Sequence, residues 1–148
     1  MIKRIGEAPQ RGQSYKVRAG AYAILPIKRR FLLTAQITDI VDIQLPGGGI
    51  DPCESPLQAL FREVREEIGW SISKPRRLGA FRRFVFMPDY DLWAEKICHI
   101  YVAHPARYIH APSEPDHETL ILDTDDALAA LGCDGGRSFL ARYVGGRP

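Results

Sequence analysis

Three glutamates crowd one short segment of the sequence, where Glu63, Glu66 and Glu67 stand beside Arg62. If the segment is helical, Glu63 and Glu67 form an i, i+4 pair of like charges, which costs roughly a few tenths of a kcal/mol. A divalent cation would remove this repulsion, because hard ions such as Mg²⁺ prefer carboxylate oxygens. A solvated acidic face is the plainer interpretation of these charges taken alone.

The segment 55–68 carries the signals of an amphipathic helix. Ser55 is a good N-cap, Gln58 three residues later completes a capping box, and Pro56 suits the first helical position. Gly69 is expected to end the helix. The three glutamates fall on one side of this helix, beside its apolar stripe. That stripe consists of Leu57, Leu60, Phe61, Val64 and Ile68.

The stretch around this helix, residues 48–70, fits the pattern GX5EX7REUXEEXGU, in which U is a bulky aliphatic residue. The matching positions are Gly48, Glu54, Arg62, Glu63, Val64, Glu66, Glu67 and Gly69, whereas Trp70 departs from the final U. The pattern resembles the Nudix box of the Nudix hydrolase family, and the preceding LPGGG is also similar. The resemblance implies an α/β fold, an α/β/α sandwich with a mixed β-sheet.

The resemblance also implies roles for individual residues of the box. Glu63, Glu66 and Glu67 would be metal ligands, joined by the backbone carbonyl of Gly48 or a neighbouring glycine. The metal would be Mg²⁺, with Mn²⁺ as a substitute. Arg62 would orient the glutamates by charge-assisted hydrogen bonds. The supporting positions would be Glu54 near the metal, Gly49 in a sharp turn and Gly69 at the end of the helix.

The implied reaction is the metal-dependent hydrolysis of a nucleoside diphosphate linked to another moiety, so the partner would be a small nucleotide diphosphate derivative. The box does not identify the general base. Glu118 and Glu114 are both candidates, because both follow the penultimate strands. A solvated loop acid is the alternative interpretation of each.

Residues outside the box are candidates for substrate contact. Arg82 and Arg83 alternate on an expected strand, so only one of them can face a pocket, where it would bind phosphate. Tyr22 could stack on a base, although aromatic residues also fill cores. Pro88 and Tyr90 stand near a position that marks substrate choice in some Nudix subfamilies, but their spacing selects none.

Two other function classes are to be weighed against hydrolysis. A Nudix-fold module that binds or senses nucleotides without cleaving them is the main alternative, although such modules usually have damaged boxes and this one keeps every glutamate. Isopentenyl diphosphate isomerase shares the fold but would need further Cys and Glu motifs in a longer chain. Among hydrolase substrates, RNA 5′ ends are kept as an alternative because basic residues cluster at 74–83. Binding to other nucleic acid is not expected.

The whole chain, 1–148, has the length of one domain, here a single Nudix hydrolase domain. Its 20 basic and 18 acidic residues leave a net charge of +2, which gives no general attraction to nucleic acid or membrane.

We expect a cytoplasmic location, because the sequence shows neither a signal region nor an apolar run of membrane-spanning length. Cys53, Cys98 and Cys133 lack the spacing of a disulfide framework or a zinc site. A homodimer is left open.

The remaining elements must hold the box in position. Residues 1–14 are polar and predict a loosely packed N-terminal arm. Strands are expected on both sides of the box helix and helices at the C-terminal end, which together favour a mixed α/β sandwich. The expected strands are 17–25, 31–36, 40–45, 76–86, 95–103 and 118–122, and the expected further helices are 124–131 and 137–144.

Overall fold

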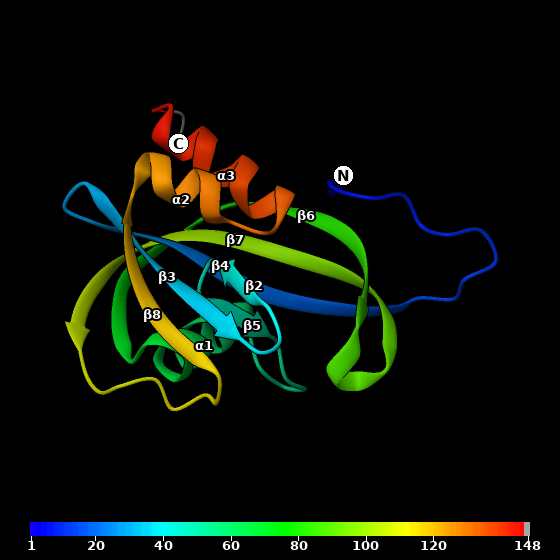
Figure 1. Ribbon diagram of the computed structural model, residues 1–148, viewed down its shortest axis with the longest axis horizontal. Coiled ribbons are helices and arrows are strands. Elements are labelled where there is room, and N and C mark those ends of the chain that lie inside the picture. Colours follow the sequence, from blue (N-terminus) through cyan, green and yellow to red (C-terminus); the bar gives the residue numbers. More distant parts are fainter. Residues whose placement is uncertain (147–148) are drawn as a thin grey trace.

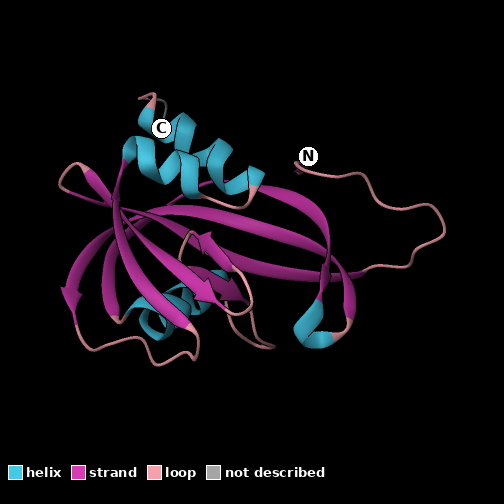
Figure 2. Cartoon of the chain, viewed as in Figure 1, coloured by secondary structure: helices cyan, strands magenta, loops and turns pink. Residues whose placement is uncertain are grey.

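The computed structural model of the protein has three layers and describes residues 1–146. A mixed β-sheet lies in the middle, with helix α1 (Pro56–Ile68) on one face and helices α2 (Thr124–Ala130) and α3 (Asp134–Val144) on the other, as Figure 1 shows. Figure 2 shows the long strands that separate the two helical layers. The expected α/β/α sandwich with a mixed sheet is therefore confirmed.

The sheet follows the strand order β1-β6-β7-β2-β3-β4, with β5 paired to β2 and β8 paired to β3. The pairs β1–β6 and β2–β7 are parallel, and the others are antiparallel. The strands are β1 (Lys3–Arg4), β2 (Lys16–Ile27), β3 (Arg30–Ile37), β4 (Val41–Gln44), β5 (Gly47–Gly49), β6 (Trp70–Met87), β7 (Leu92–Tyr108) and β8 (His117–Asp123). A 3₁₀ turn, η1 (Pro88–Tyr90), joins β6 to β7.

Strand β6 extends further than the segment predicted at 76–86. It begins at Trp70, directly after the box helix, and its register with β7 shifts around Lys74 and Pro75. Lys74 has a positive φ of 51°, and proline cannot donate a ladder hydrogen bond. These two residues interrupt the local strand pattern without ending the strand, because the long partner β7 holds both parts.

Helix α1 begins and ends at the predicted residues. The Ser55 hydroxyl accepts a hydrogen bond from the Gln58 N–H at 3.1 Å, and the Gln58 side chain accepts one from the Ser55 N–H at 2.8 Å. Gly69 closes the helix with a left-handed φ of 72°, and its N–H donates to the carbonyl of Arg65. Both ends therefore satisfy backbone groups that a helix otherwise leaves unpaired.

The predicted apolar stripe of α1 is partly wrong. Leu57 and Phe61 are 39% and 40% exposed, whereas the other three members of the stripe are buried. Ala59 and Glu67 take the inward positions instead, and Glu67 is only 6% exposed. The helix is thus rotated toward its acidic side, which brings one carboxylate against the sheet.

Each helical layer covers its own apolar core. The core under α1 also contains residues of β2, β3, β6 and β7, and the second core joins the sheet to α2 and α3. Part of the predicted N-terminal arm is attached to the sheet, because Lys3 and Arg4 pair with Phe81 and Arg82 of β6. No helix within residues 1–146 is long and apolar enough to cross a membrane.

Candidate active site

Strand β5 places three glycines between helix α1 and strand β2. Gly47 has a φ of 149°, and a Cβ there would overlap the backbone of β2. A Cβ on Gly48 would overlap the carboxylate of Glu63, so this glutamate rests directly on the strand. Gly49 differs from the expected turn glycine, since its φ is ordinary and the space around it is open. What it contributes is a backbone carbonyl.

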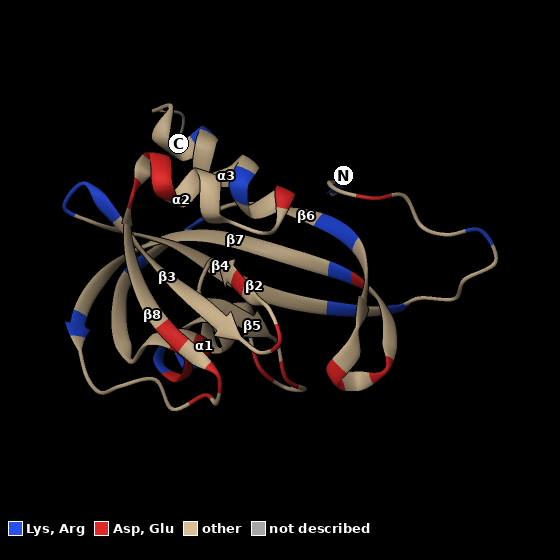
Figure 3. Cartoon of the chain, in the orientation of Figure 1, with Lys and Arg blue, Asp and Glu red and all other residues tan. Residues whose placement is uncertain are grey.

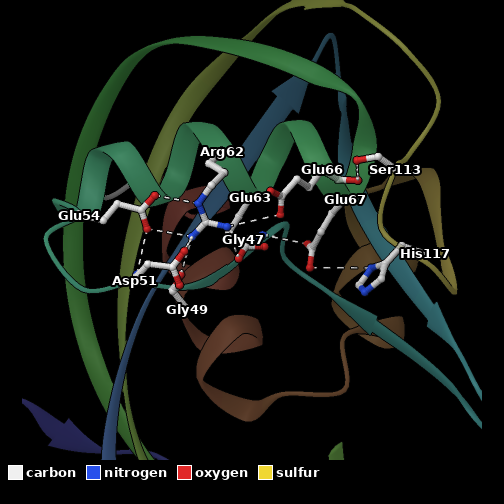
Figure 4. A network of polar contacts seen from close by, with 10 residues as sticks. All are labelled: Gly47, Gly49, Asp51, Glu54, Arg62, Glu63, Glu66, Glu67, Ser113 and His117. Atoms are coloured by element: carbon white, nitrogen blue, oxygen red, sulfur yellow. Dashed lines mark hydrogen bonds and ion pairs between the residues drawn. The ribbon is translucent and has the colours of Figure 1, made fainter.

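Arg62 lies at the centre of the acidic cluster, as Figure 4 shows. Its Nε and Nη2 donate to the two carboxylate oxygens of Glu54 at 2.7 and 2.8 Å, which is a bidentate ion pair. Its Nη1 donates to Glu63 at 3.0 Å and to Glu66 at 3.4 Å. Nη2 also donates to the carbonyl of Gly49 at 3.0 Å. One guanidinium therefore joins the glycine strand, the loop before α1 and two of the three clustered glutamates.

These contacts shift the pKa values of the charged groups. The hydrogen bond from Arg62, together with that from the backbone N–H of Asp51, lowers the pKa of Glu54 to about 2. The same bond to Glu54 raises the pKa of Arg62. Burial raises the pKa of Glu63, while its ion pair with Arg62 acts in the opposite direction. The loop acid and the arginine thus stay charged, and Glu63 is the more easily protonated.

Glu67 occupies the most enclosed position of the three glutamates. The N–H of Gly47 donates to its Oε1 at 3.1 Å, and Nδ1 of His117 lies 3.8 Å from its Oε2. Burial raises the pKa of Glu67 to about 8, although the Gly47 N–H favours the charged form and so lowers it. The charges of Glu63 and Glu114 contribute to the same increase in the pKa. Glu67 therefore carries a proton at neutral pH when no cation is bound.

His117 was assigned no role from the sequence, but it lies beside this buried carboxylate. Its Nδ1 is 2.8 Å from the hydroxyl of Thr34, which is fully buried. Burial lowers the pKa of His117, so the ring is neutral at neutral pH. The sequence signal that could have drawn attention to His117 was strand alternation, which places His117 and Thr119 on the same face of β8. The structure shows that this face meets α1, because the Thr119 hydroxyl donates to the carbonyl of Ile68 at 3.4 Å.

The two candidates for the general base lie in different surroundings. Glu118 sits between His117 and Thr119 on β8, so its side chain points to the opposite face from α1 and is exposed. The structure does not bring it to the glutamates. Glu114 lies in the loop before β8, and its N–H donates to the carbonyl of Glu66 at 3.0 Å. Its charge also raises the pKa of Glu67.

A hollow opens beside the glycine strand, between β2 and the loop before α1. It is bordered by Glu63 and by residues of β2, η1 and β7, including Arg18, Tyr22, Tyr90 and Lys96. The guanidinium of Arg18 lies over the Tyr90 ring, 5.0 Å from its centroid. Because glycines have no side chains, the Glu63 carboxylate reaches this hollow past β5.

A second cavity adjoins the hollow beneath the α2–α3 connection. Tyr22 and Lys96 line both spaces, and Arg83 lines the second. Arg82 points to the other face of β6, where its Nη1 donates to Glu95 at 3.2 Å. As expected, only one of the two arginines faces a pocket: Arg83 lines the second cavity. Arg82 is not brought to the site. Lys96 had no signal in the sequence beyond its charge.

The carboxylates of α1 offer oxygen donors to a hard cation, although they are bonded to other groups in this structure. Among residues 1–146, no group of three or more His, Cys, Asp or Glu side chains is already arranged as a metal site. Glu63 and Glu66 instead share the Nη1 of Arg62, and Glu67 bonds to Gly47. All three nevertheless present oxygen donors along one side of the helix, beside backbone that approaches closely, which suits Mg²⁺ chemistry.

The layered fold is shared with solved structures of Nudix hydrolases. The NUDIX hydrolase from Nitrosomonas europaea has a TM-score of 0.75 at 17% identity, with 89% of this chain and 91% of that chain covered. The MutT NUDIX hydrolase from Burkholderia pseudomallei has a TM-score of 0.67 at 24% identity, with 85% and 97% covered. Residues 14–143 match the family model described as the NUDIX domain, so the chain belongs to the Nudix family.

Curated relatives are similar over shorter stretches. A protein of Bacillus subtilis (strain 168), provisionally named an 8-oxo-dGTP diphosphatase, is 31% identical over 74 residues, which cover 50% of each chain. An RNA pyrophosphohydrolase of Halorhodospira halophila (strain DSM 244 / SL1) is 48% identical over 42 residues, 28% of this chain and 23% of its own. The chain thus spans half or less of the length of these relatives.

Proposed function

We propose that this protein is a divalent-metal-dependent hydrolase that cleaves the diphosphate linkage of a nucleoside diphosphate joined to another moiety. The observation that carries the proposal is the Arg62-centred cluster of carboxylates, which lies on one helix and opens past a glycine strand into a hollow. Membership of the Nudix family supports the same reaction class.

The ligands in this proposal are Glu63, Glu66 and Glu67, together with the carbonyl of Gly48. Their oxygens suit Mg²⁺, with Mn²⁺ as a substitute. A bound divalent cation would screen the diphosphate oxygens, polarise phosphorus and lower the pKa of an attacking water. Glu67 would have to give up its proton first, because only the carboxylate is a good ligand.

The other residues of the cluster would position this ligand set. Arg62 holds Glu63 and Glu66 in place and is itself anchored by Glu54, whose low pKa keeps it ionised. For the general base we favour Glu114 over Glu118, because its loop bonds to the backbone of Glu66 whereas Glu118 faces away.

The hollow beside Glu63 is the proposed place for the nucleotide. Tyr22 lines both this hollow and the adjoining cavity, and it offers an aromatic face for a base. The relatives named above put both oxidised nucleotides and RNA 5′ ends among the substrates to test.

A substrate screen tests the proposal. Purified protein would be incubated with NDP-sugars, dinucleoside polyphosphates, (d)NTPs including 8-oxo-dGTP, and 5′-triphosphorylated RNA, with Mg²⁺, Mn²⁺ or EDTA. Released phosphate and nucleotide would be measured. We expect turnover of at least one nucleoside diphosphate derivative, its loss in EDTA, and its loss in Glu67→Gln. Folded protein that stays at background with every substrate and metal would contradict hydrolysis; nucleotide binding without turnover would instead support the sensing module.

A further inference from the structure

Two cationic side chains oppose each other across strands β6 and β7. Arg83 is the direct partner of Lys96 in this antiparallel pair. Directly opposed residues point to the same face, with Cβ atoms roughly 4.5–5.5 Å apart, and like charges in such positions destabilise a sheet. Figure 3 shows basic segments on both of these neighbouring strands. Both side chains line the cavity beneath the α2–α3 connection.

No ion pair within residues 1–146 offsets this pair of charges. Among residues 1–146, neither Arg83 nor Lys96 takes part in an ion pair. Asp42 lines the same cavity, but its carboxylate accepts a hydrogen bond from Gln44 at 2.6 Å. With two cations and one anion, the cavity keeps a net positive charge. A site of this kind is stabilised by an anionic ligand.

Lys96 keeps its charge at neutral pH. Tyr22 raises the pKa of Lys96, against the opposing effects of burial and of the Arg83 charge. The Lys96 ammonium lies 5.7 Å from the centroid of the Tyr22 ring, within range of a cation–π contact. This contact only weakly offsets the cost of holding the partly buried Lys96 ammonium next to the positive charge of Arg83.

The position of the pair connects it to the glutamate cluster. Lys96 and Tyr22 border both the inner cavity and the hollow that Glu63 reaches. The two spaces therefore share Tyr22 and Lys96 in their walls, with Glu63 in the hollow and Arg83 in the inner cavity. A neutral base or sugar in this cavity would leave both cations unpaired, whereas a phosphate group would neutralise them and accept hydrogen bonds from each.

We propose that Arg83 and Lys96, with Tyr22 beside them, form an anion subsite for a further phosphate group of the substrate, separate from the diphosphate that is cleaved. The favoured substrates are then nucleoside diphosphate derivatives that carry at least one additional phosphate. The substrate assignment rests on the proposed function, but the anion subsite itself does not.

Melting in the absence of metal tests the subsite directly. Wild type, Lys96→Met, Arg83→Met and the exposed control Arg76→Met would be melted in EDTA with increasing inorganic phosphate, against sodium chloride of equal ionic strength. We expect phosphate to stabilise wild type and Arg76→Met. Lys96→Met and Arg83→Met should lose most of the phosphate response, and each should melt no lower than wild type without phosphate because the repulsion is removed.

Three melting results would overturn the subsite. These are a wild-type response no larger in phosphate than in chloride, an unchanged phosphate response in both cavity variants, and an equal loss in Arg76→Met. If one cavity variant does not fold, the other decides. The assay needs neither metal nor turnover, so it can succeed or fail independently of the proposed hydrolase activity.

Kinetics then distinguish a substrate phosphate from a free phosphate ion. Dinucleoside polyphosphates of increasing phosphate number would be compared in wild type and Lys96→Met. We expect Lys96→Met to raise KM roughly 10- to 100-fold for the longer chains, the size of a lost charged hydrogen bond, with a smaller change in kcat and in the shortest substrate. Equal KM changes for all chain lengths would mean that the subsite takes a free anion, and the substrate part of the proposal would be wrong.

Discussion

Replacing Glu67 by Gln should change how the stability of the metal-free protein depends on pH. The pKa of Glu67 rises from 4.5 in the unfolded reference to about 8 in the folded protein, chiefly through burial. Each tenfold change in proton affinity is worth about 1.4 kcal/mol, so ionising this carboxyl in the fold costs roughly 4–5 kcal/mol. That is a large part of the roughly 5–15 kcal/mol by which a domain is stable.

The sign follows from proton binding. Between pH 4.5 and about 8 the folded protein binds the Glu67 proton and the unfolded chain does not. The free energy of unfolding therefore contains a contribution that is fully present below pH 4.5 and is lost as pH rises through about 8. Glu67→Gln is neutral throughout, so wild type should lose roughly 2 kcal/mol relative to this variant between about pH 6.5 and 8.

Urea unfolding in EDTA across this pH range measures the difference. Glu118→Gln is the matched control, because it removes a carboxylate from an exposed position on the opposite face of β8. Its pH dependence should follow that of wild type. If the wild-type and Glu67→Gln curves stay parallel within error, Glu67 is ionised in the metal-free fold and the argument from its burial fails.

Three further outcomes are expected. Arg62→Gln should lower both stability and turnover, because Glu54, Glu63 and Glu66 lose their common partner; normal melting with normal turnover would contradict this. Gly48→Ala should reduce turnover while the protein still folds, since its methyl group must displace the Glu63 carboxylate; circular dichroism and kinetics check both parts. Mg²⁺ at ~100 times its dissociation constant should add about 2.7 kcal/mol to the free energy of unfolding, and an unchanged melting temperature would count against the cation site. Near neutral pH, Mg²⁺ binding should also release up to about one proton, which calorimetry in buffers of different ionisation enthalpy would measure.

Features that depend on neighbours in the sequence were predictable. The capping box of Ser55 and Gln58 and the glycine that ends α1 act within a few residues, so the segment 55–68 defines its own ends. Alternation along a strand is also local, which is why Arg82 and Arg83 could be expected to diverge. It could not say which of the two would face a cavity.

Features that depend on helix rotation were not predictable with the same accuracy. The periodicity of α1 places Leu57 and Phe61 in one stripe with buried residues, yet both are substantially exposed. The sheet accepts the helix with Glu67 turned inward, because the Gly47 N–H offers the buried carboxylate a hydrogen bond. An apolar pattern gives the general direction of burial, but the contacts with the sheet decide the final rotation.

The sequence by itself determined the box helix, its caps and the set of acids on one side of it, because these rest on spacings of three and four residues. Only the tertiary structure decided which distant groups meet that helix. Gly47 bonds to Glu67 across 20 positions, and His117 bonds to Thr34 across 83. Lys96 and Arg83 meet because β6 and β7 pair in one register, and a slip of a single residue would turn the side chains of one strand to the other face. Such contacts between distant residues depend on strand order and register, which a short stretch of sequence does not determine.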